Sequence, residues 1–346
     1  MKPIKTYKKI LLVRPEMMGD TILLTPVISL IKKYLPETKI FMLLQHPMEE
    51  VIKNNQEVAG CILTKKNLNL FEYLQLVAKI KQEKFDLSIV FEDNPTPNLA
   101  LLCFLAGIPN RIGDKSRLLY SWIYNKGAWL NSADPKLHHI ELYLDLLKPL
   151  NLPLEYLPLK LNLETQAENK IRDLLPVKKS AAEKFIGLHI GTGGGNKALL
   201  PKTYAEIAAG LQEKLHGKII LIGGGKELST LNGMQKYLKQ PFIDTVNKLS
   251  LQELFALIKN LDLFIGVDSG PLHIAAALKI PIIAIYTAKD VNPNRWLPWM
   301  TKYAMIKNEA PCPIKCSHRE CNLDYCQKGI SAIKIIEEAD KLLKNE

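Results

Sequence analysis

Residues 261–286 read LDLFIGVDSGPLHIAAALKIPIIAIY. Two apolar, β-branched runs, residues 261–267 and 281–286, flank a short stretch with helical character at residues 272–278. A strand, a crossover helix and a second strand in this order form a βαβ unit, in which the two strands are parallel. The segment therefore predicts an α/β fold built on a doubly wound parallel sheet.

The same alternation of short strands and amphipathic helices continues through the rest of the chain, in two halves. The other expected strands are residues 9–14, 39–44, 86–91, 185–190 and 218–222, with weaker candidates near Cys61 and Arg111. The other expected helices are residues 21–34, 138–150, 203–215, 251–259 and 331–343. Residues 151–160 contain two prolines and no helical period, and we expect a linker over residues 151–180.

The length of the chain, 346 residues, exceeds what one hydrophobic core usually supports. We expect two Rossmann-like domains, residues 1–165 and 166–330, with a cleft between them. The last helical segment, residues 331–346, is expected to pack back on the first domain.

The charge balance is strongly basic, since 46 Lys and Arg residues against 35 Asp and Glu residues give a net charge of +11. Such a balance favours anionic partners, which include nucleotides, acidic glycolipids, phospholipid surfaces and nucleic acid. The basic residues are spread over both halves and form no stripe with interleaved aromatic residues, so we expect no nucleic-acid partner. With 47% apolar and 23% charged residues, the composition excludes disorder as the main state.

No stretch of the sequence predicts a membrane span. The longest uncharged stretch, residues 94–110, carries three prolines and is too short to cross a bilayer. The apolar run that starts at Ile10 ends at Arg14, far short of a signal-peptide core. We therefore expect a cytoplasmic protein, and peripheral contact at the inner face of the inner membrane is left open.

The first candidate site is Gly19-Asp20, which follows the opening strand. A carboxylate at the carboxyl end of a parallel strand lies where open α/β sheets bind ligands, and it can accept a proton there. The alternative is structural, with Asp20 capping the following helix by accepting a backbone N–H. Pro26 falls inside that helix, where it removes a hydrogen bond and is expected to kink it.

Two glycine-rich loops follow strands of the second half. The first, residues 191–197 (GTGGGNK), departs from a P-loop because Ala198 stands where a magnesium-binding Ser or Thr belongs. Its glycine N–H groups and Lys197 still form a cradle for phosphate. In the second, residues 223–227, Glu227 can accept hydrogen bonds from ribose hydroxyls. The alternatives are a flexible surface loop and a plain strand-to-helix turn.

The most specific motif is Asp268-Ser-Gly-Pro-Leu-His273, between the strand and the helix of the opening segment. Ser269 or Gly270 can cap the helix, and Pro271 suits its first turn. The helix N-terminus offers N–H groups and a positive dipole to a pyrophosphate, and His273 can donate to a phosphate oxygen. A lone His here would be structural, but Asp268 beside it at the strand tip favours a binding site.

Together these motifs resemble glycosyltransferase family 9, the ADP-heptose:lipopolysaccharide heptosyltransferases. The resemblance spans residues 8–340, and its most diagnostic parts are Gly19-Asp20 and the segment from Asp268 to His273. It implies the GT-B architecture, with two Rossmann-like domains facing a central cleft. It also implies inverting transfer of a sugar, heptose from ADP-heptose, to a lipopolysaccharide core or a similar glycolipid. The other matching elements are Leu24-Thr25-Pro26, Phe85-Asp86, Arg111-Ile112-Gly113, the Lys197 loop and Ala275-Ala276-Ala277.

By this resemblance each matching residue takes a role. Asp20 would be the general base that removes the proton from the acceptor hydroxyl. Asp268 would bind sugar hydroxyls, and Glu227 would bind the ribose. The residues expected to hold the donor diphosphate are Thr192, Lys197, Ser269, Gly270 and His273. Residues 197–201 (KALLP) depart from the family pattern, in which the Lys is often followed by two residues and then by Trp-Pro or a similar pair.

Inverting sugar transfer needs one base near the acceptor and positive potential near the departing diphosphate. Metal-dependent transferases often hold a divalent ion with an Asp-x-Asp pair, and the sequence has none. Lys197, His273 and a helix N-terminus would supply the positive charge. We therefore expect that catalysis requires no cofactor and no divalent metal.

Four cysteines, Cys312, Cys316, Cys321 and Cys326, lie close together near the C-terminus. Four thiols in such a cluster suit a structural Zn or Fe ion, although the spacing is not that of a zinc ribbon, and His318 is a spare ligand. The alternatives are a reduced loop without metal and a strained disulfide.

Two other functions fit the same motifs. A GT-B sugar-nucleotide epimerase would convert its donor without an acceptor, and a nucleotide-sugar-binding protein would bind it without turnover. The acceptor is expected to contact residues 45–60, 92–98 and 113–135, where no motif identifies it. The sequence leaves the sugar, the nucleobase and the oligomeric state undecided.

Overall fold

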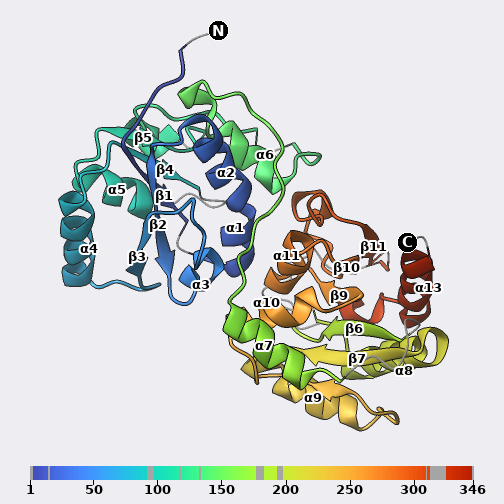
Figure 1. Ribbon diagram of the computed structural model, residues 1–346. Helices are drawn as coiled ribbons and strands as arrows, with labels where there is room; N and C mark the ends of the chain where they lie inside the picture. Colours follow the sequence, from blue (N-terminus) through green and yellow to red (C-terminus); the bar gives the residue numbers. More distant parts are fainter. Residues whose placement is uncertain are drawn as a thin grey trace. The chain divides into compact units, whose positions relative to one another are not determined.

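The computed structural model describes residues 3–14, 16–91, 97–116, 118–131, 134–176, 183–192, 198–308, 310–311 and 325–344, apart from the side chains of Leu118 and Leu119. The chain forms two compact units, Met1–Asn162 and Leu163–Glu346. The first unit runs from blue to green in Figure 1, and the second runs from green to red. The sequence placed this division after residue 165.

The first unit is built on a parallel sheet with the strand order β3-β2-β1-β4-β5. Its strands are β1 (Lys9–Val13), β2 (Lys39–Gln45), β3 (Gly60–Thr64), β4 (Leu87–Val90) and β5 (Asn110–Ile112). β1 occupies the centre, where Leu11 pairs with Phe41 of β2 and with Ser88 of β4. Every strand expected in this half is present, the two weaker candidates included.

Helices pack on both faces of this sheet, because successive side chains of a strand point to opposite sides and β1 is buried after Lys9. One layer contains α4 (Leu70–Gln82), α5 (Pro97–Leu105) and the 3₁₀ helix η1 (Leu118–Ile123), which share an apolar cluster with Leu11 and Val13. The opposite layer contains α1 (Met18–Leu23), α2 (Thr25–Tyr34) and α6 (His139–Asp145) (Figure 1). Two short pieces complete the unit, α3 (Glu49–Ile52) and the 3₁₀ helix η2 (Lys148–Leu150).

The second unit contains a six-stranded parallel sheet with the order β11-β10-β9-β6-β7-β8. Its strands are β6 (Lys184–His189), β7 (Gly217–Ile222), β8 (Ile243–Asp244), β9 (Leu263–Val267), β10 (Ile282–Tyr286) and β11 (Tyr303–Lys307). Its helices are α7 (Thr165–Leu174), α8 (Pro201–Leu215), α9 (Leu228–Gln235), α10 (Leu251–Lys259), α11 (Gly270–Ala277), α12 (Tyr325–Lys328) and α13 (Ala332–Lys344), with 3₁₀ helices η3 (Gly225–Glu227) and η4 (Pro293–Arg295). Residues 261–286 form β9-α11-β10, with β9 and β10 paired in parallel as predicted. Across the helices that the structure describes, none is long and apolar enough to span a membrane.

The interval 151–180 was expected to be a linker, and this expectation is wrong for its second part, which contains α7. α7 packs on α10 of the same unit and buries Ala167 and Ile171. Its Lys170 also pairs with Glu253 of α10, with Nζ 2.6 Å from Oε1. The helix has few apolar residues, so its stability comes from this tertiary contact rather than from a pattern visible in the sequence.

The last helix also differs from its expectation. α13 was expected to pack on the first domain, but its apolar face lies against α8 and β11 of the second unit. Ile335, Ala339 and Leu342 are buried there and join the apolar cluster of that sheet. Because β11 forms the edge of the sheet next to α13, the helix finds its apolar partner within its own unit.

The helix expected over residues 21–34 is two helices, α1 and α2, which meet at Leu24. Pro26 lies in the first turn of α2, where its missing N–H costs no hydrogen bond. The predicted kink is therefore a break just before the proline. Thr25 stabilises this junction, because its buried Oγ1 donates to the carbonyl of Ile22 over 2.7 Å.

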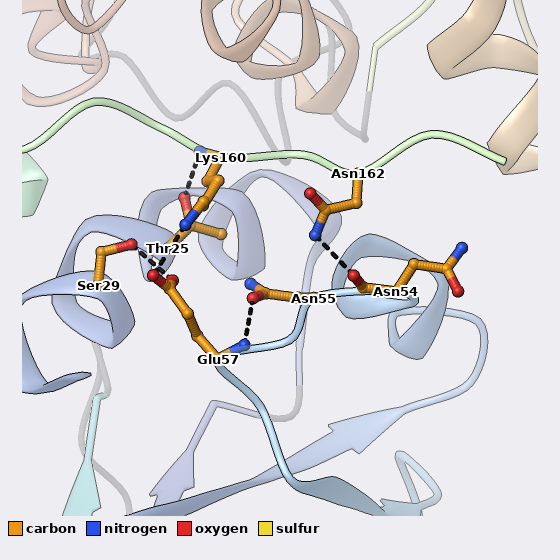
Figure 2. A network of polar contacts seen from close by, with 7 residues as sticks. All are labelled: Thr25, Ser29, Asn54, Asn55, Glu57, Lys160 and Asn162. Atoms are coloured by element: carbon orange, nitrogen blue, oxygen red, sulfur yellow. Dashed lines mark hydrogen bonds and ion pairs between the residues drawn. The ribbon is translucent and has the colours of Figure 1, made fainter. Parts of the chain in front are cut away.

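The chain that leaves the first unit is tied to this junction, as Figure 2 shows. The backbone N–H of Lys160 donates to Thr25 Oγ1 over 3.0 Å, and its ammonium group lies 2.8 Å from Glu57 Oε1. The other carboxylate oxygen of Glu57 accepts a hydroxyl from α2 over 2.7 Å. Asn162 Nδ2 donates to the carbonyl of Asn54 over 3.0 Å. These contacts explain why the chain as far as Asn162 belongs to the first unit.

Replacing Thr25 by Val should lower the free energy of unfolding of the first unit by about 1–2 kcal/mol, because the Lys160 N–H and the Ile22 carbonyl both lose their hydroxyl partner. Thr25→Ser keeps the hydroxyl and should retain most of the stability. Urea unfolding of the three proteins measures the difference. Equal stability of the Val and Ser variants would show that this hydroxyl does not hold the departing chain.

Candidate active site

In each unit the strand order reverses beside a central strand. In the first unit the chain passes from β1 outward to β2 and β3, and then crosses to β4 and β5 on the other side. In an open parallel sheet, the loops that follow the two strands at such a reversal diverge and leave a crevice for ligands. In the first unit these strands are β1, which ends at Val13, and β4, which ends at Val90.

A buried ion pair lies at this reversal. The guanidinium of Arg14, directly after β1, contacts Asp20 of α1, with Nη2 2.6 Å from Oδ2. The exposed fractions of the two side chains are only 9% and 8%. Nη1 of Arg14 donates to the carbonyl of Phe91, the residue after β4, over 3.0 Å. Arg14 thus joins the carboxyl ends of β1 and β4 and holds the Asp20 carboxylate at this edge of the sheet.

The geometry decides against Asp20 as a helix cap. Asp20 lies within the first turn of α1, and the N-cap position belongs to Met17. Met17 has a φ of 61°, a left-handed conformation that L residues adopt only at some energetic cost. Sequence reasoning missed Arg14, although a charge directly after the apolar run of residues 10–13 was a usable signal.

The second unit has its own reversal, between β6 and β9. The chain passes from β6 to β7 and β8 on one side, and then crosses to β9, β10 and β11 on the other. Gly191 and Thr192 follow β6, while Asp268 and Ser269 follow β9. Residues that the sequence assigned to donor binding therefore lie at the predicted ligand-binding edge of this sheet.

A serine and a buried histidine meet across this second reversal. Ser269 Oγ donates to the carbonyl of Val267 over 2.9 Å and lies 3.3 Å from Nδ1 of His189, the last residue of β6. Burial lowers the pKa of His189 to about 4, so its imidazole is neutral near pH 7. Because the single Ser269 proton goes to Val267, the matching tautomer of His189 donates its Nδ1–H to Ser269. Sequence reasoning named Ser269 and missed His189.

The helix α11 begins at the same edge. Ser269 is its N-cap residue and makes no side-chain cap, so the first-turn amides are not satisfied by that hydroxyl. Pro271 lies in the first turn, as the sequence predicted. His273 is buried inside α11, with its ring centroid 6.4 Å from that of Trp296. His273 therefore lies within the packed part of the unit rather than on open surface.

Asp268 lies at the rim of β9 and β10. It lines a narrow hollow together with Tyr286 and Thr287 at the carboxyl end of β10. Burial, followed by the nearby charge of Asp268, raises the pKa of Tyr286. The Tyr286 hydroxyl stays protonated and donates to the carbonyl of Trp296 over 2.9 Å. This bond holds the Tyr286 side chain in place beside the hollow.

Glu227 reaches the carboxyl edge from the next strand, β7. Its Oε2 accepts the N–H of Gly224 over 2.8 Å, so the residue closes the turn after β7. The same side chain lies against Gly191, where a Cβ would come within 2.4 Å of Glu227 Cγ. Only a glycine at position 191 leaves room for this carboxylate beside the loop after β6. Glu227 therefore closes the turn after β7 and lies next to the residues that follow β6.

Several predicted site residues lie outside the described residues. These are Lys197 with Gly193, Gly194 and Gly195 of its loop, three of the clustered cysteines (Cys312, Cys316 and Cys321) and His318. Cys326, the fourth cysteine, is buried, and its carbonyl accepts from Asn308 Nδ2 over 3.3 Å. Within the part of the chain that the structure describes, no group of three or more His, Cys, Asp or Glu side chains is placed to hold a metal ion.

Solved structures share this architecture. A family 9 glycosyltransferase from Veillonella parvula superposes with a TM-score of 0.82 at 21% identity, over 99% of this chain and 98% of that one. An Escherichia coli heptosyltransferase solved with ADP superposes with a TM-score of 0.73 at 16% identity, over 96% of this chain and 99% of that one. The two doubly wound units therefore have the GT-B fold, as predicted.

The sequence comparisons narrow this fold to a family. The profile of glycosyltransferase family 9 (heptosyltransferase) matches residues 73–326. The chain is also 26% identical to the lipopolysaccharide heptosyltransferase 3 of Escherichia coli K12 over 293 residues, which cover 81% of this chain and 82% of that protein. The chain belongs to glycosyltransferase family 9, and it is a glycosyltransferase.

His189 should make the stability of the second unit sensitive to acid. Its pKa is about 4 in the folded unit against 6.5 for an ordinary His, so the unfolded chain binds the proton first as the pH falls. The free energy of unfolding should therefore be full above about pH 6.5 and fall by up to about 3 kcal/mol as the pH approaches 4.

Unfolding measured between pH 7 and pH 4 tests this dependence. His189→Asn should remove this part of it, whereas the same change at the exposed His216 should leave it in place. An unchanged slope in the His189 variant would contradict the assignment.

Proposed function

We propose that the chain transfers heptose from ADP-heptose to a lipopolysaccharide-type glycolipid, with inversion at the anomeric carbon and with Asp20 as the general base. Membership in family 9 supports heptosyl transfer, and ADP in a solved relative supports the nucleotide. A relative named lipopolysaccharide heptosyltransferase supports the acceptor class. The observation that carries the proposal is the buried Arg14–Asp20 pair at the strand reversal of the first unit.

The reaction requires one group to take up a proton. The acceptor oxygen bonds to the anomeric carbon while the bond from that carbon to ADP breaks, and the hydroxyl proton passes to the Asp20 carboxylate. Arg14 favours the charged carboxylate, because an adjacent cation stabilises the anion. Its contact at 2.6 Å also fixes the direction of the carboxylate, so Arg14 acts as a positioning residue. Because a diphosphate is a good leaving group, a single weak base is sufficient for the transfer.

The donor would bind at the carboxyl edge of the second sheet. Asp268 would accept hydrogen bonds from the sugar hydroxyls, and Glu227 would accept them from the ribose. The groups that would hold the diphosphate are Thr192, Lys197, Ser269, Gly270 and His273. The N-terminal dipole of α11 and the Lys197 ammonium would stabilise the charge that develops on ADP, without a divalent metal. The hydrogen bonds that hold Ser269 and Glu227 support a preformed donor site.

The acceptor would bind to the first unit. The net charge of +11 favours an anionic glycolipid, and residues 45–60, 92–98 and 113–135 would contact it. The first of these segments lines a hollow of about 590 Å³, with Lys53, Asn54 and Asn55 among its polar groups. A hollow of this size accommodates a sugar residue. The proposed place of action is the inner face of the inner membrane.

Asp20→Asn should lower the kcat of heptosyl transfer at least about 100-fold, because the amide cannot take up the acceptor proton. The KM for ADP-heptose should change little, since Asp20 does not belong to the donor-binding unit. Steady-state kinetics with ADP-heptose and a lipopolysaccharide-core acceptor provide the measurement. Glu16→Gln removes an exposed carboxylate close in sequence and should leave kcat unchanged.

The amide leaves Arg14 without its anionic partner, so a thermal melt must first show that the variant is folded. Asp20→Glu keeps a carboxylate and should retain partial activity. Full activity of folded Asp20→Asn would remove the proposed base. Conversion of ADP-heptose in the absence of any acceptor would instead indicate an epimerase.

Donor binding can be tested apart from catalysis. Saturating ADP should stabilise the second unit by about 2.7 kcal/mol at 100 times its Kd. Lys197→Ala should reduce the thermal shift with ADP, while Lys202→Ala, an exposed lysine at the start of α8, should not. Asp268→Ala should keep the shift with ADP and lose the additional shift that ADP-heptose gives. Equal shifts for the two lysine variants would contradict the role of Lys197.

A further inference from the structure

The helix α5 of the first unit is apolar on both its buried and its exposed side. Its sequence, PNLALLCFL, contains no charged residue. Ala100, Leu102 and Cys103 face the sheet and are buried, as expected for a helix of an α/β layer. Leu101, Phe104 and Leu105 are nevertheless exposed on the outer side. A surface helix normally carries polar residues there, so this face requires an explanation.

The first turns of α4 also expose apolar side chains on their outer side. Leu76 and Ile80 are buried against the sheet. Leu70 and Phe71 point outward with exposed fractions of 75% and 68%, and Leu74 is exposed as well. Leu70 and Phe71 are the most exposed large apolar side chains of this unit that the structure describes. Asn69 and Glu72 form a capping box, so the helix start is well defined and its exposed apolar residues do not result from fraying.

A tryptophan continues the surface. Trp122 of η1 is 65% exposed, and its ring contacts that of Phe104 edge to face, with centroids 5.6 Å apart. The guanidinium of Arg111 lies 5.2 Å from the Phe104 ring. Tryptophan and arginine in such an arrangement are typical of surfaces that lie between water and an apolar phase.

These side chains form one surface. α4, α5 and η1 bury their inner sides in the same apolar cluster on the same face of the sheet. α4 and α5 are neighbours, as are α5 and η1, and Figure 1 shows α4 beside α5. Tyr73 of α4 also donates its hydroxyl to the carbonyl of Asn98 in α5 over 3.0 Å. We call this surface the apolar face, defined by Leu70, Phe71, Leu74, Leu101, Phe104, Leu105 and Trp122.

Among the residues that the structure describes, the charges around the apolar face are mainly positive. Lys65 and Lys66 precede α4, and the exposed Lys79 and Lys81 lie on it. The only acidic residue of α4 is Glu72, which Lys65 neutralises at 2.9 Å. No acidic residue lies in residues 97–112, and the next one, Asp114, is buried and accepts from Ser116. An apolar surface with a cationic border complements an anionic lipid surface, which attracts Lys and Arg and receives apolar side chains.

We propose that the apolar face docks the first unit on an anionic lipid bilayer, with Phe71, Phe104 and Trp122 inserted at the headgroup level. The choice of a bilayer rests on the proposed function, because a lipopolysaccharide-type acceptor is anchored in one. α4 follows the carboxyl end of β3, so the apolar face begins at the same edge of the sheet at which Asp20 lies. Docking there would bring the base to the surface from which the acceptor projects.

Co-sedimentation of the full chain with vesicles tests the proposal. The wild type should bind vesicles of phosphatidylglycerol and phosphatidylethanolamine at least tenfold more tightly than vesicles of phosphatidylcholine alone. Raising the NaCl concentration to 0.5 M should weaken binding several-fold, because salt screens the cationic border. Phe71→Glu and Phe104→Glu should each reduce binding to the anionic vesicles at least tenfold. Ile333→Glu introduces the same change at an exposed apolar residue of α13 and should leave binding unchanged.

A less disruptive substitution controls for the possibility that the Glu variants lose binding because they misfold. Leu74→Gln should fold like the wild type in a thermal melt and still bind the anionic vesicles more weakly. Unchanged vesicle binding of all three folded variants would overturn the proposal. It would also be overturned if the wild type bound no vesicles but formed a dimer that Phe71→Glu dissociates, since the apolar face would then be a protein interface.

Activity on a water-soluble acceptor separates this inference from the proposed function. With a delipidated lipopolysaccharide core, the Phe71, Phe104 and Leu74 variants should transfer heptose at the wild-type rate. With the acceptor embedded in anionic vesicles, their rates should fall in parallel with vesicle binding. If the wild type binds vesicles but transfers no heptose to either acceptor, the proposed function fails and the docking surface stands.

Discussion

The arrangement of the first unit depends on one buried ion pair at the reversal of its strand order. Removing two charges from water costs several kcal/mol for each ion, and the cost is offset only when the geometry is good and further hydrogen bonds are made. Arg14 meets both conditions, because it contacts Asp20 at 2.6 Å and donates to Phe91 across the sheet. Replacing a buried ion pair by well-packed apolar residues is often neutral or stabilising, so such a pair is weak evidence of a role in stability alone. The retained charge therefore suits a reacting carboxylate rather than stability.

In the second unit, other contacts organise the carboxyl edge of the sheet. Its reversal contains a neutral pair, Ser269 with the buried His189, and a carboxylate, Glu227, that packs against the bare backbone of Gly191. The first-turn amides of α11, which the Ser269 side chain does not cap, and the positive end of the helix dipole suit this edge to an anionic ligand. The two units thus share a topology, but the carboxylate of the first edge pairs with a buried cation, whereas the second edge also offers helix amides to an anion.

The outer surface of the first unit carries apolar side chains that its core does not need. The layer of α4, α5 and η1 buries an ordinary apolar cluster on its inner side and exposes a second apolar set on its outer side. The stability of the folded unit does not explain the exposed apolar set, because exposed aromatic residues add nothing to the core. A transferase with a lipid-anchored acceptor has a reason to carry such a set, since it must work where water meets the bilayer.

The sequence by itself determined the two parallel sheets, the family and most of the candidate residues. Strand and helix periods, the proline of the α1–α2 junction and the Asp268 to His273 motif are local signals, which short segments express before they fold. Only the tertiary structure decided that Asp20 pairs with Arg14, that His189 meets Ser269, and that Glu227 rests on Gly191. It also decided that α7 forms and that α13 packs on α8, because partners distant in sequence stabilise both helices. Except for the pair of Arg14 and Asp20, which lie close together in the sequence, such contacts depend on which strands and helices become neighbours, and no local pattern of residues encodes that.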